Sequence, residues 1–475
     1  GVQRDMNNKK ITHMLVLFST LFMALIVYLT VTDLYYRDEY TSSSLNSRNA
    51  ARETNITRGT IYDRSGTVLA ETKDGTAKRV YPYSNLYSHV IGYSSSTYGK
   101  SLIESVYNNE LLGNNGILSV SNLKKKLYGE KMHGADLTLT LDHELQRRAN
   151  ELMKSYTGAA VAMNPQTGEI LAMVSKPDFD PDEDALSKNW NSLSNSESSP
   201  FLTRATMGLY PPGSTFKLVT TAAMLENGFE NSTVEDSNGY VKIGSEKISN
   251  AGGERNGHTD LHLGFIKSSN VFFADTATKM SDDMLLAAAE DFMFNKKTGV
   301  KFPHNRSRFT TSSMSEGERA ITAIGQGKTL ATPLHLAMIA SAISNDGKMM
   351  RPYIVSKVSS SGYGIVNTKP YMLKKCLEST DALTIKDLMR DAVKSGTGRS
   401  AQIYGMEVCG KTGTAENEKT DEDSTKTHAV FVGFAPYDNP QIAVSVVLEY
   451  AGSSGGTIAA PIAREIMKKY FEIQK

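Results

Sequence analysis

The sequence predicts an α+β fold in which helices cover an antiparallel sheet, preceded by a small β-rich module and one apolar helix. Three observations carry this prediction. The run 11–32 is apolar throughout, and short strand-like runs separated by turn residues follow it up to about residue 140. The rest of the chain begins and ends with strand runs around a helical middle. Strands that cluster in runs, instead of alternating with helices, indicate an antiparallel sheet.

Length and composition agree with a folded chain of several domains. The 475 residues leave room for two or three domains at about 150 residues each. Hydrophobic residues make up 40% of the chain, which argues against general disorder. The 52 Lys and Arg residues balance 51 Asp and Glu residues, so the net charge gives no sign of a nucleic-acid-binding face.

The first predicted element is a transmembrane helix over residues 11–32. This run contains no Asp, Glu, Lys or Arg and can cross about 30 Å of hydrocarbon. A cleaved signal peptide is the rival interpretation, but the run is longer than a usual signal core and no small-x-small cleavage site follows it. Lys and Arg precede the run, and acidic residues dominate just after it. The positive-inside rule therefore places residues 1–10 in the cytoplasm and the rest of the chain outside.

Residues 33–140 are predicted to form a separate small module. Residues 33–57 are polar and predict a stalk or a short extended lead. Asp63-Arg64-Ser65-Gly66 separates two β-rich runs and predicts a hairpin turn, while residues 101–113 have a helical pattern.

Residues 141–475 are predicted to form the main domain. A short strand runs into an amphipathic helix within residues 137–156, with Asp142 at the N-cap. Two apolar strands flank residues 164–168, and helical patterns fill much of residues 214–350. The final predicted elements are strands at 406–411, 429–434 and 442–450, and a helix from Pro461.

Ser214 and Lys217 are the first candidate catalytic pair. Pro211-Pro212-Gly213 allows a sharp turn, so Ser214 is predicted near a helix N-terminus, where free N–H groups favour an oxyanion. Lys217 lies one turn later on the same face. A lysine can act as base for a serine only when burial or another cation lowers its pKa. Ser121 and Lys124 have the same spacing, so a capping serine beside a solvated lysine is the simpler alternative for the motif alone.

Ser268-Ser269-Asn270 lies in a segment that is apolar on both sides. A buried Ser and Asn must find hydrogen-bond partners. Two interpretations stay open. These residues cap the helix that follows them, or Ser268 relays protons and Asn270 orients Lys217.

The tripeptide Lys-Thr-Gly occurs twice. At residues 297–299 the glycine stands where the residue after a helix belongs, which predicts a helix end. Lys411-Thr412-Gly413-Thr414 instead continues an apolar stretch and predicts the edge strand of a cleft. There Gly413 allows two backbones to approach, and Lys411 with the threonine hydroxyls attracts a carboxylate.

Cys376 and Cys409 are the two cysteines of the chain. An extracytoplasmic location permits a disulfide between them, although Cys409 is expected to fill core space. A zinc site that includes His428 is a weaker alternative, which needs a hairpin to bring the residues together.

Ser-x-x-Lys, Ser-x-Asn and Lys-Thr-Gly, in this order, are the motifs of penicillin-binding proteins and serine β-lactamases. From Arg58 to its end the sequence resembles a class B penicillin-binding protein, a membrane-anchored peptidoglycan D,D-transpeptidase. Further matching segments are Gly325-Gln326-Gly327 with Thr332-Pro333, Gly396-Thr397-Gly398 before the third motif, and Arg58-Gly59, Asp63-Arg64 and Gly66 near the membrane.

The resemblance implies the penicillin-binding transpeptidase fold, with residues 33–140 as a dimerisation-like pedestal and 141–475 as the transpeptidase domain. It implies that Ser214 attacks the penultimate D-Ala carbonyl of a stem peptide while Lys217 acts as general base. Ser214 and Thr414 N–H groups then form the oxyanion hole. The remaining implied site residues are Ser268 and Asn270 beside Lys217, and Lys411, Thr412 and Gly413 at the substrate carboxylate. No metal or organic cofactor is implied.

The resemblance also implies a location and partners. The chain is expected in the bacterial cell membrane as a single-pass protein, with β-lactams as covalent inhibitors and a SEDS-family glycosyltransferase as partner. No glycosyltransferase module precedes the pedestal, so the chain is expected to be monofunctional. The alternatives are a β-lactam-hydrolysing or D,D-carboxypeptidase relative, and a non-catalytic sensor or scaffold. No Glu-x-x-Leu-Asn element, the class A deacylation element, lies between Asn270 and Lys411, which favours the transferase.

Overall fold

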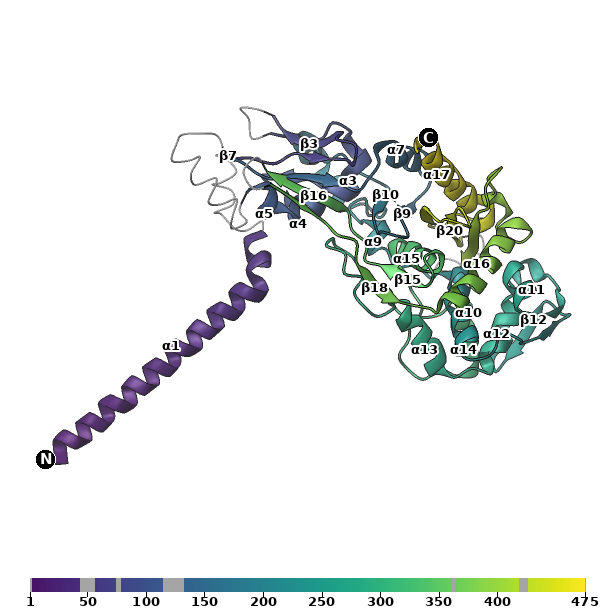
Figure 1. Cartoon of the computed structure of the whole chain (residues 1–475), viewed down its shortest axis with the longest axis horizontal. Helices are drawn as coiled ribbons and strands as arrows, with labels where there is room; N and C mark the ends of the chain where they lie inside the picture. The colour runs from purple at the N-terminus through teal and green to yellow at the C-terminus, as the bar shows by residue number, and fades with distance from the viewer. Residues whose placement is uncertain are drawn as a thin grey trace.

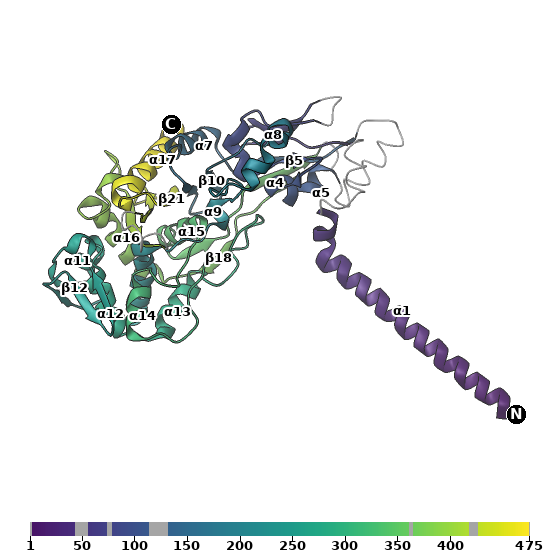
Figure 2. The ribbon, with the colours of Figure 1, turned by 180° about the vertical axis from the view of Figure 1, so that it is seen from behind.

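The computed structural model describes residues 2–42, 56–73, 78–113, 132–360, 364–417 and 426–474. A long N-terminal helix leads into a β-rich N-terminal module, and a larger body of sheet and helices follows (Figure 1). The view from behind shows the same order of parts, with the N-terminal helix standing away from the rest (Figure 2).

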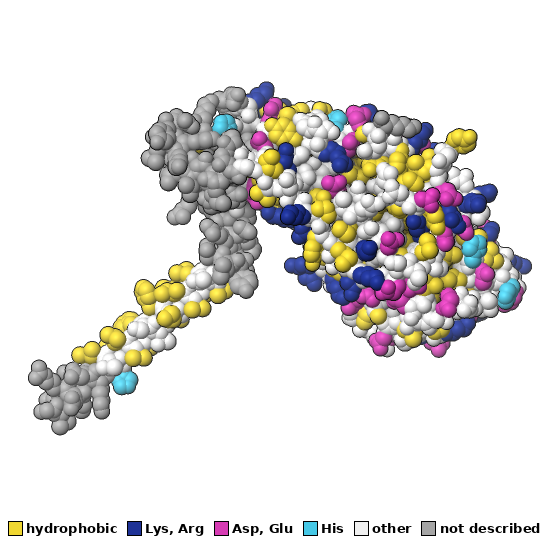
Figure 3. Space-filling model, in the orientation of Figure 1, with side chains coloured by type: hydrophobic (Ala, Val, Ile, Leu, Met, Phe, Trp, Pro, Cys, Tyr) yellow, Lys and Arg dark blue, Asp and Glu magenta, His cyan; other side chains and the backbone are white. Residues whose placement is uncertain are grey.

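The N-terminal helix α1 (Val2–Ser42) includes the predicted transmembrane run. Its apolar side chains from Ile11 to Val31 are exposed (Figure 3). Residues Ile11–Thr32 are long and apolar enough to span a membrane, and they form the one such helix in the described part of the chain. The predicted extended lead is wrong over residues 33–42, because no Gly or Pro there ends the helix. Residues 43–55 lie outside the described part.

A six-stranded sheet, in the order β17-β16-β8-β2-β3-β4, forms the N-terminal module. The predicted hairpin is confirmed, because β2 and β3 pair antiparallel around Asp63, whose carboxylate accepts hydrogen bonds from the Ser65 and Thr67 N–H groups at 2.9 and 2.7 Å. β16 and β17 come from far along the chain, which the sequence did not indicate. The elements are β1 (Ile56–Thr57), β2 (Ile61–Tyr62), β3 (Val68–Thr72), β4 (Arg79–Val80), α3 (Ser88–Ile91), β5 (Ser94–Ser95), β6 (Gly99–Lys100), α4 (Leu102–Val106), α5 (Asn108–Leu111), β7 (Met132–His133), β8 (Asp136–Leu139), β16 (Val355–Ser360) and β17 (Gly364–Asn367).

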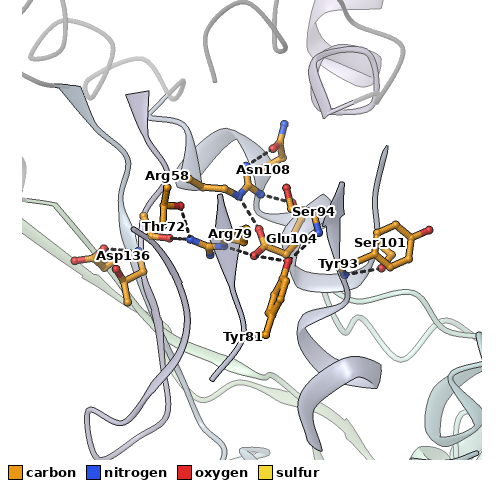
Figure 4. A network of polar contacts seen from close by, with 12 residues as sticks. Arg58, Thr72, Arg79, Tyr81, Tyr93, Ser94, Ser101, Glu104, Asn108 and Asp136 are labelled. Carbon is orange, nitrogen blue, oxygen red and sulfur yellow. Dashed lines mark hydrogen bonds and ion pairs between the residues drawn. The ribbon is translucent and has the colours of Figure 1, made fainter. Parts of the chain in front are cut away.

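A buried ion network fastens α4 to the strands of this module (Figure 4). The Glu104 carboxylate accepts hydrogen bonds from Arg58 Nε at 2.6 Å and Arg79 Nε at 2.7 Å. Arg58 also donates to Asn108 Oδ1 at 2.7 Å. Burial by itself would raise the pKa of Glu104, but the two guanidinium groups outweigh it and hold the pKa below its usual range. The Arg58 that marks the family resemblance is therefore a structural residue.

The main body is built on a five-stranded sheet in the order β10-β9-β21-β20-β19, and every pair in it is antiparallel. Alternate residues of β9 face opposite sides. Ala159, Val161 and Met163 pack toward α15, whereas Ala160 and Ala162 pack toward α7 and α17. The predicted fold class is thus confirmed. The elements are α7 (His143–Leu152), β9 (Gly158–Met163), β10 (Ile170–Lys176), α15 (Pro333–Ser344), β19 (Cys409–Ala415), β20 (His428–Ala435), β21 (Ile442–Leu448) and α17 (Ala460–Ile473).

Local sequence explains where these helices begin. The Asp142 carboxylate caps α7 by accepting from Leu145 N–H at 3.0 Å, as predicted. Thr332 caps α15, with Pro333 in its first turn, where a missing N–H costs nothing.

The region between β10 and β19 is only partly helical. Two β-ribbons, β11 with β14 and β12 with β13, interrupt the predicted helices, because closely spaced glycines at 239, 244, 252, 253 and 257 favour turns. The elements are α8 (Glu183–Ser194), α9 (Arg204–Met207), α10 (Lys217–Glu226), β11 (Val234–Asp236), β12 (Tyr240–Ile243), β13 (Glu246–Ser249), β14 (Gly257–Thr259), α11 (Leu261–Ile266), α12 (Asn270–Thr278), α13 (Asp282–Asp291), α14 (Glu316–Ala323), β15 (Lys348–Met350), β18 (Met372–Lys375) and α16 (Ser379–Lys394).

The helix end predicted at Lys297-Thr298-Gly299 is wrong. α13 ends at Asp291, and the chain turns at Met293 and Asn295, whose φ angles are 69° and 62°. These left-handed residues end the helix before Gly299 is reached.

Candidate active site

The nucleophile candidate Ser214 lies in a tight turn that two other segments hold in place. Residues Gly213–Phe216 form a 3₁₀ turn that leads directly into α10. Gly213 has a φ of 52°, and a Cβ there would lie 2.7 Å from the Thr414 carbonyl oxygen, so the position requires glycine. Its N–H donates to the Gly325 carbonyl at 2.9 Å. The turn is therefore clamped between β19 and the Gly325-Gln326-Gly327 segment.

Lys217 is fully buried at the start of α10. Its Nζ donates to the Ser268 carbonyl at 2.7 Å and to Asn270 Oδ1 at 2.7 Å. Burial, together with the charge of Lys411, lowers the pKa of Lys217 well below its usual value. A neutral amine has two N–H groups and one lone pair. Since the two carbonyl-type oxygens take both N–H groups of that form, its lone pair is left for the third neighbour, the Ser268 hydroxyl at 3.3 Å, or for an incoming proton.

Ser268 lies between the two buried lysines. Its hydroxyl accepts from Lys411 Nζ at 2.7 Å and lies 3.3 Å from Lys217 Nζ. Its φ of 57° is unusual for a serine and shows that the backbone is held in this orientation by its surroundings. A hydroxyl that accepts from one lysine and donates to the lone pair of the other can pass a proton between them.

The structure separates the residues of Ser268-Ser269-Asn270 by their contacts. Ser269 is the helix cap, because its hydroxyl accepts from Phe272 N–H at 3.0 Å. Ser268 and Asn270 instead contact Lys217. The Asn270 amide also donates to the Ser249 carbonyl at 2.8 Å, which fixes which of its two ends faces the lysine.

A buried carboxylate that was not predicted from the sequence lies behind this motif. Asp236 Oδ2 accepts from Asn250 at 2.6 Å, from Asn256 at 2.7 Å and from the Ser269 hydroxyl at 3.1 Å. Asn250 Oδ1 in turn accepts from Val271 N–H at 3.1 Å. Asp236 thus holds the start of α12, and with it Ser268 and Asn270. Asp236 lies on β11, a strand that was not among the predicted elements. Predicting that strand was the one way to anticipate that Asp236 holds the start of α12.

Lys411 and Thr412 lie on β19, the edge strand of the main sheet, as predicted. Lys411 is fully buried, with its Nζ 5.6 Å from the centre of the Phe265 ring. Burial lowers the pKa of Lys411 to about 7. Thr412 Oγ1 lies 2.7 Å from Thr397 Oγ1, so the Gly396-Thr397-Gly398 turn contacts the third motif directly.

A contact inside the protein requires glycine at position 413. A Cβ at this position would lie 2.9 Å from the Pro212 carbonyl oxygen and 3.1 Å from Thr215 Cγ2. The close approach is therefore between β19 and the Ser214 turn, within the protein itself.

A cavity of about 440 Å³ opens beside these residues. Ser214, Asn270 and Thr414 line it, together with Ser249 and Gln326. Two carboxylates, Glu246 and Glu416, also lie on its wall. The structure thus brings Ser214, Asn270 and Thr414 to one cavity, and the buried Lys217 and Lys411 meet at Ser268 next to them.

One predicted contact is missing. Among the described residues, the Ser214 hydroxyl makes no hydrogen bond, and Lys217 is turned toward Ser268 and Asn270. The second Ser-x-x-Lys, at Ser121 and Lys124, lies outside the described residues.

The cysteines form neither of the predicted alternative structures. Cys376 and Cys409 are buried and free, and burial raises the pKa of both thiols. Cys409 pairs with Phe434 and His428 pairs with Ala415, so the cysteine and the histidine lie at opposite ends of the β19–β20 ladder. No group of three or more His, Cys, Asp or Glu side chains in the described part of the chain could hold a metal ion.

Comparison with known families gives two matches. Residues 158–468 match the penicillin binding protein transpeptidase domain. Residues 58–137 match the penicillin binding protein A dimerisation domain.

Individual relatives match along nearly the whole chain. The peptidoglycan D,D-transpeptidase PbpA of Mycolicibacterium smegmatis is 32% identical over 483 residues, which cover 96% of this chain and 98% of the relative. The peptidoglycan D,D-transpeptidase PbpA of Mycobacterium tuberculosis is 30% identical, over a match that covers 95% of this chain and 97% of the relative. Penicillin-binding protein A of M. tuberculosis, as its penicillin G acyl-enzyme complex, superposes with a TM-score of 0.81 at 30% identity, over 88% of this chain and 100% of that one.

Proposed function

Because this chain belongs to the class B penicillin-binding proteins and is a peptidoglycan D,D-transpeptidase that acts through a serine acyl-enzyme, we propose that Ser214 is its nucleophile and Lys217 its general base. The observation that carries the proposal is the position of Lys217, which is fully buried and whose pKa is lowered by that burial and by the charge of Lys411. The two N–H groups of Lys217 are held by the Ser268 carbonyl and Asn270, beside a cavity that Ser214 lines.

The acylation step follows from this arrangement. Ser214 Oγ forms a bond with the penultimate D-Ala carbonyl carbon while its proton moves to Lys217 Nζ. The Ser214 and Thr414 N–H groups stabilise the oxyanion. The C–N bond to the terminal D-Ala then breaks, and the proton passes from Lys217 through the Ser268 hydroxyl to the leaving nitrogen. Lys411, Thr412 and Thr414 bind the terminal carboxylate, and Gly413 keeps β19 close to the Ser214 turn.

The second half of the reaction reverses these roles. An amine from a neighbouring stem peptide attacks the acyl carbon and loses its proton to Lys217, and the Ser214 oxygen leaves and regains a proton. Lys217 must first turn from Ser268 and Asn270 by enough to reach Ser214. Substrate binding in the cavity supplies that rearrangement, since catalytic hydrogen bonds often tighten only in the complex.

The experiment is intact-mass measurement after exposure to benzylpenicillin. We expect one adduct, on the peptide that contains Ser214, and none in Ser214→Ala. Lys411→Ala should lose acylation, whereas Lys297→Ala, in the Lys-Thr-Gly that lies away from the cavity, should acylate normally. An adduct that survives in Ser214→Ala would remove the nucleophile assignment.

The hydrolytic alternative makes a different prediction for the same adduct. A transferase adduct should persist for minutes to hours, because water needs its own positioned base. Glu246 and Glu416 are the cavity carboxylates that could supply one. Loss of the adduct at several per second, slowed by Glu416→Gln or Glu246→Gln, would favour the β-lactamase or D,D-carboxypeptidase alternative. A chain that binds penicillin but never cross-links stem peptides would be the sensor or scaffold.

The membrane topology belongs to the same proposal. The apolar span and the basic residues before it support an N-terminus in the cytoplasm and a catalytic domain outside. Protease added outside spheroplasts should then digest the chain beyond about residue 33, and full protection would contradict this orientation. A SEDS-family glycosyltransferase remains the proposed partner, and co-purification of the two from membranes tests it.

A further inference from the structure

The segment 347–377 carries an unusual set of charges. It contains six basic residues and no Asp or Glu, in a chain that has 52 basic and 51 acidic residues overall. Lys374 and Lys375 form ion pairs with Asp291 and Glu378. The other four, which have no ion pair with a carboxylate among the described residues, are Lys348, Arg351, Lys357 and Lys369.

The same segment exposes apolar side chains. Ile365 is 61% exposed, Val366 69%, Tyr371 58% and Met372 48%. Outside α1, these are four of the seven large hydrophobic side chains that are exposed in the described part of the chain. A cluster of exposed apolar residues among cations marks an interaction surface better than scattered ones do.

Ile365 and Val366 lie on β17, at the open edge of the N-terminal sheet, and Tyr371 and Met372 lie further along the same segment, where β18 begins. β17 is the last strand of that sheet, and its only strand neighbour in the described structure is β16. Beyond β17 the chain keeps to the same course, because Thr368 N–H donates to the Ser356 carbonyl at 2.8 Å and Arg351 N–H donates to the Tyr371 carbonyl at 2.8 Å. The Arg351 guanidinium also lies 5.6 Å from the centre of the Tyr371 ring. We call the exposed residues 364–372, with Arg351 and Lys357, the basic edge.

The β17 end of the basic edge lies at the side of the module where the chain arrives from α1, whereas Tyr371 and Met372, at β18, lie further from α1 (Figure 1). Ser359 of β16 pairs with Asp136, at the start of β8. Next to Asp136, the Ala135 N–H donates to the Glu110 carbonyl of α5 at 2.8 Å, and α1 contacts α5. Figure 1 shows β16 beside α4 and α5, close to the end of α1. Figure 3 shows dark blue side chains along the side of the body nearest α1.

We propose that the basic edge rests on the surface of the membrane that holds α1 and binds its anionic phospholipid headgroups. Lysine and arginine beside Tyr and apolar residues are the composition that lies at the headgroup level. The unpaired N–H and C=O groups of the edge strand exclude deeper insertion into hydrocarbon. A second copy of the chain is disfavoured as occupant, because two such edges would bring cations together.

The inference rests on the proposed anchoring, so the test measures both. The full chain is reconstituted in vesicles of pure phosphatidylcholine and in vesicles with one quarter phosphatidylglycerol. Flotation with the vesicles reports the anchor. A nitroxide on Ile365→Cys reports the edge, because the two native cysteines are buried and should not react. Its collisions with oxygen, which enters lipid, are compared with those of an aqueous nickel chelate.

We expect the ratio of oxygen to nickel collisions at residue 365 to rise several-fold in the anionic vesicles only. Lys357→Glu with Lys369→Glu should return it to the neutral-lipid value, as should high salt. A label at Tyr404→Cys, which is fully exposed in the main body, is the matched control and should not respond. Normal acylation by benzylpenicillin verifies that each variant is folded.

Two results would overturn the proposal. A chain that floats with both vesicles but shows the same collision ratio at residue 365 in each has a working anchor and no lipid contact at the edge. Protection of residue 365 that rises with protein concentration in detergent would show a second copy as the occupant. A chain that does not float at all would instead contradict the anchoring.

Discussion

Replacing Ser268 by Ala tests the proton relay most directly. The change removes the hydroxyl that lies between Lys411 and Lys217 and keeps the backbone carbonyl that Lys217 contacts at 2.7 Å. Asn270 keeps its own hydrogen bond to Lys217. The substitution therefore isolates one oxygen atom of the site.

The size of the effect follows from the hydrogen bond that is lost. The Ser268 hydroxyl accepts from Lys411 at 2.7 Å, while the other acceptor of Lys411, the Thr412 carbonyl, is 3.4 Å away. A hydrogen bond to a charged group is worth about 1.5–3 kcal/mol. If that stabilisation is needed in the transition state, the acylation rate should fall about 10- to 140-fold at about 1.4 kcal/mol per factor of ten.

The pH profile should move as well, and its direction distinguishes a relay from a packing role. The pKa of Lys411 is about 7, so the charge that it supplies is lost as the pH rises through that value. The hydroxyl favours the charged form of Lys411, and its removal lowers this pKa further. The decline of acylation on the alkaline side should therefore begin at a lower pH in Ser268→Ala than in the native chain.

The assay is the second-order rate of acylation by a fluorescent penicillin between pH 5 and 9. Ser268→Gly is the matched control for strain, because glycine accepts the φ of 57° without cost and lacks the same hydroxyl. Both variants should be slow. If Ser268→Ala acylates within twofold of the native rate across this range, Ser268 does not relay protons. If only Ala is slow, the effect is strain.

Three further predictions address the base, its support and the N-terminal module. Lys217→Ala should slow acylation by about 10²–10⁴-fold in stopped-flow measurements, and a smaller loss would mean that another group takes the Ser214 proton. Asp236→Asn should lower the acylation rate constant and leave the affinity for the unreacted β-lactam unchanged, because Asp236 positions Ser269 and Asn250 without lining the cavity. An equal loss of rate constant and affinity would indicate general unfolding. Glu104→Ala should reduce the free energy of unfolding by about 3–5 kcal/mol, because it leaves two buried guanidinium groups unpaired. The pKa of Glu104 is lower in the folded chain than in the unfolded chain, where it is about 4.3. The ion network should therefore stabilise the fold fully above about pH 4.3 and lose that effect as the pH falls through the lower, folded pKa. Urea titrations of both chains at pH 7 and pH 3 measure this loss, and a Glu104→Ala effect of equal size at both pH values would contradict the prediction.

Features that depend on a short stretch of chain were predictable from the sequence. The span 11–32 is a matter of length and apolar composition, which one run of residues contains completely. The hairpin at Asp63 and the cap at Asp142 arise from contacts within four residues. Each of the three motifs is likewise a short stretch of chain, and their order along the sequence indicated the family.

Features that depend on burial or on distant partners were decided by the tertiary structure. The sequence could not separate Ser268 from Ser269, because only the position of two lysines, from α10 and β19, selects the one that lies between them. The lowered pKa of Lys217 comes from burial and from Lys411, almost 200 positions further along the chain. Long-range packing decided that the two cysteines stay apart. It also placed β16 and β17 in the N-terminal sheet, far from their neighbours in the sequence. Local sequence sets the dihedral angles and caps of each element, whereas desolvation and charge coupling exist only once the elements have packed together.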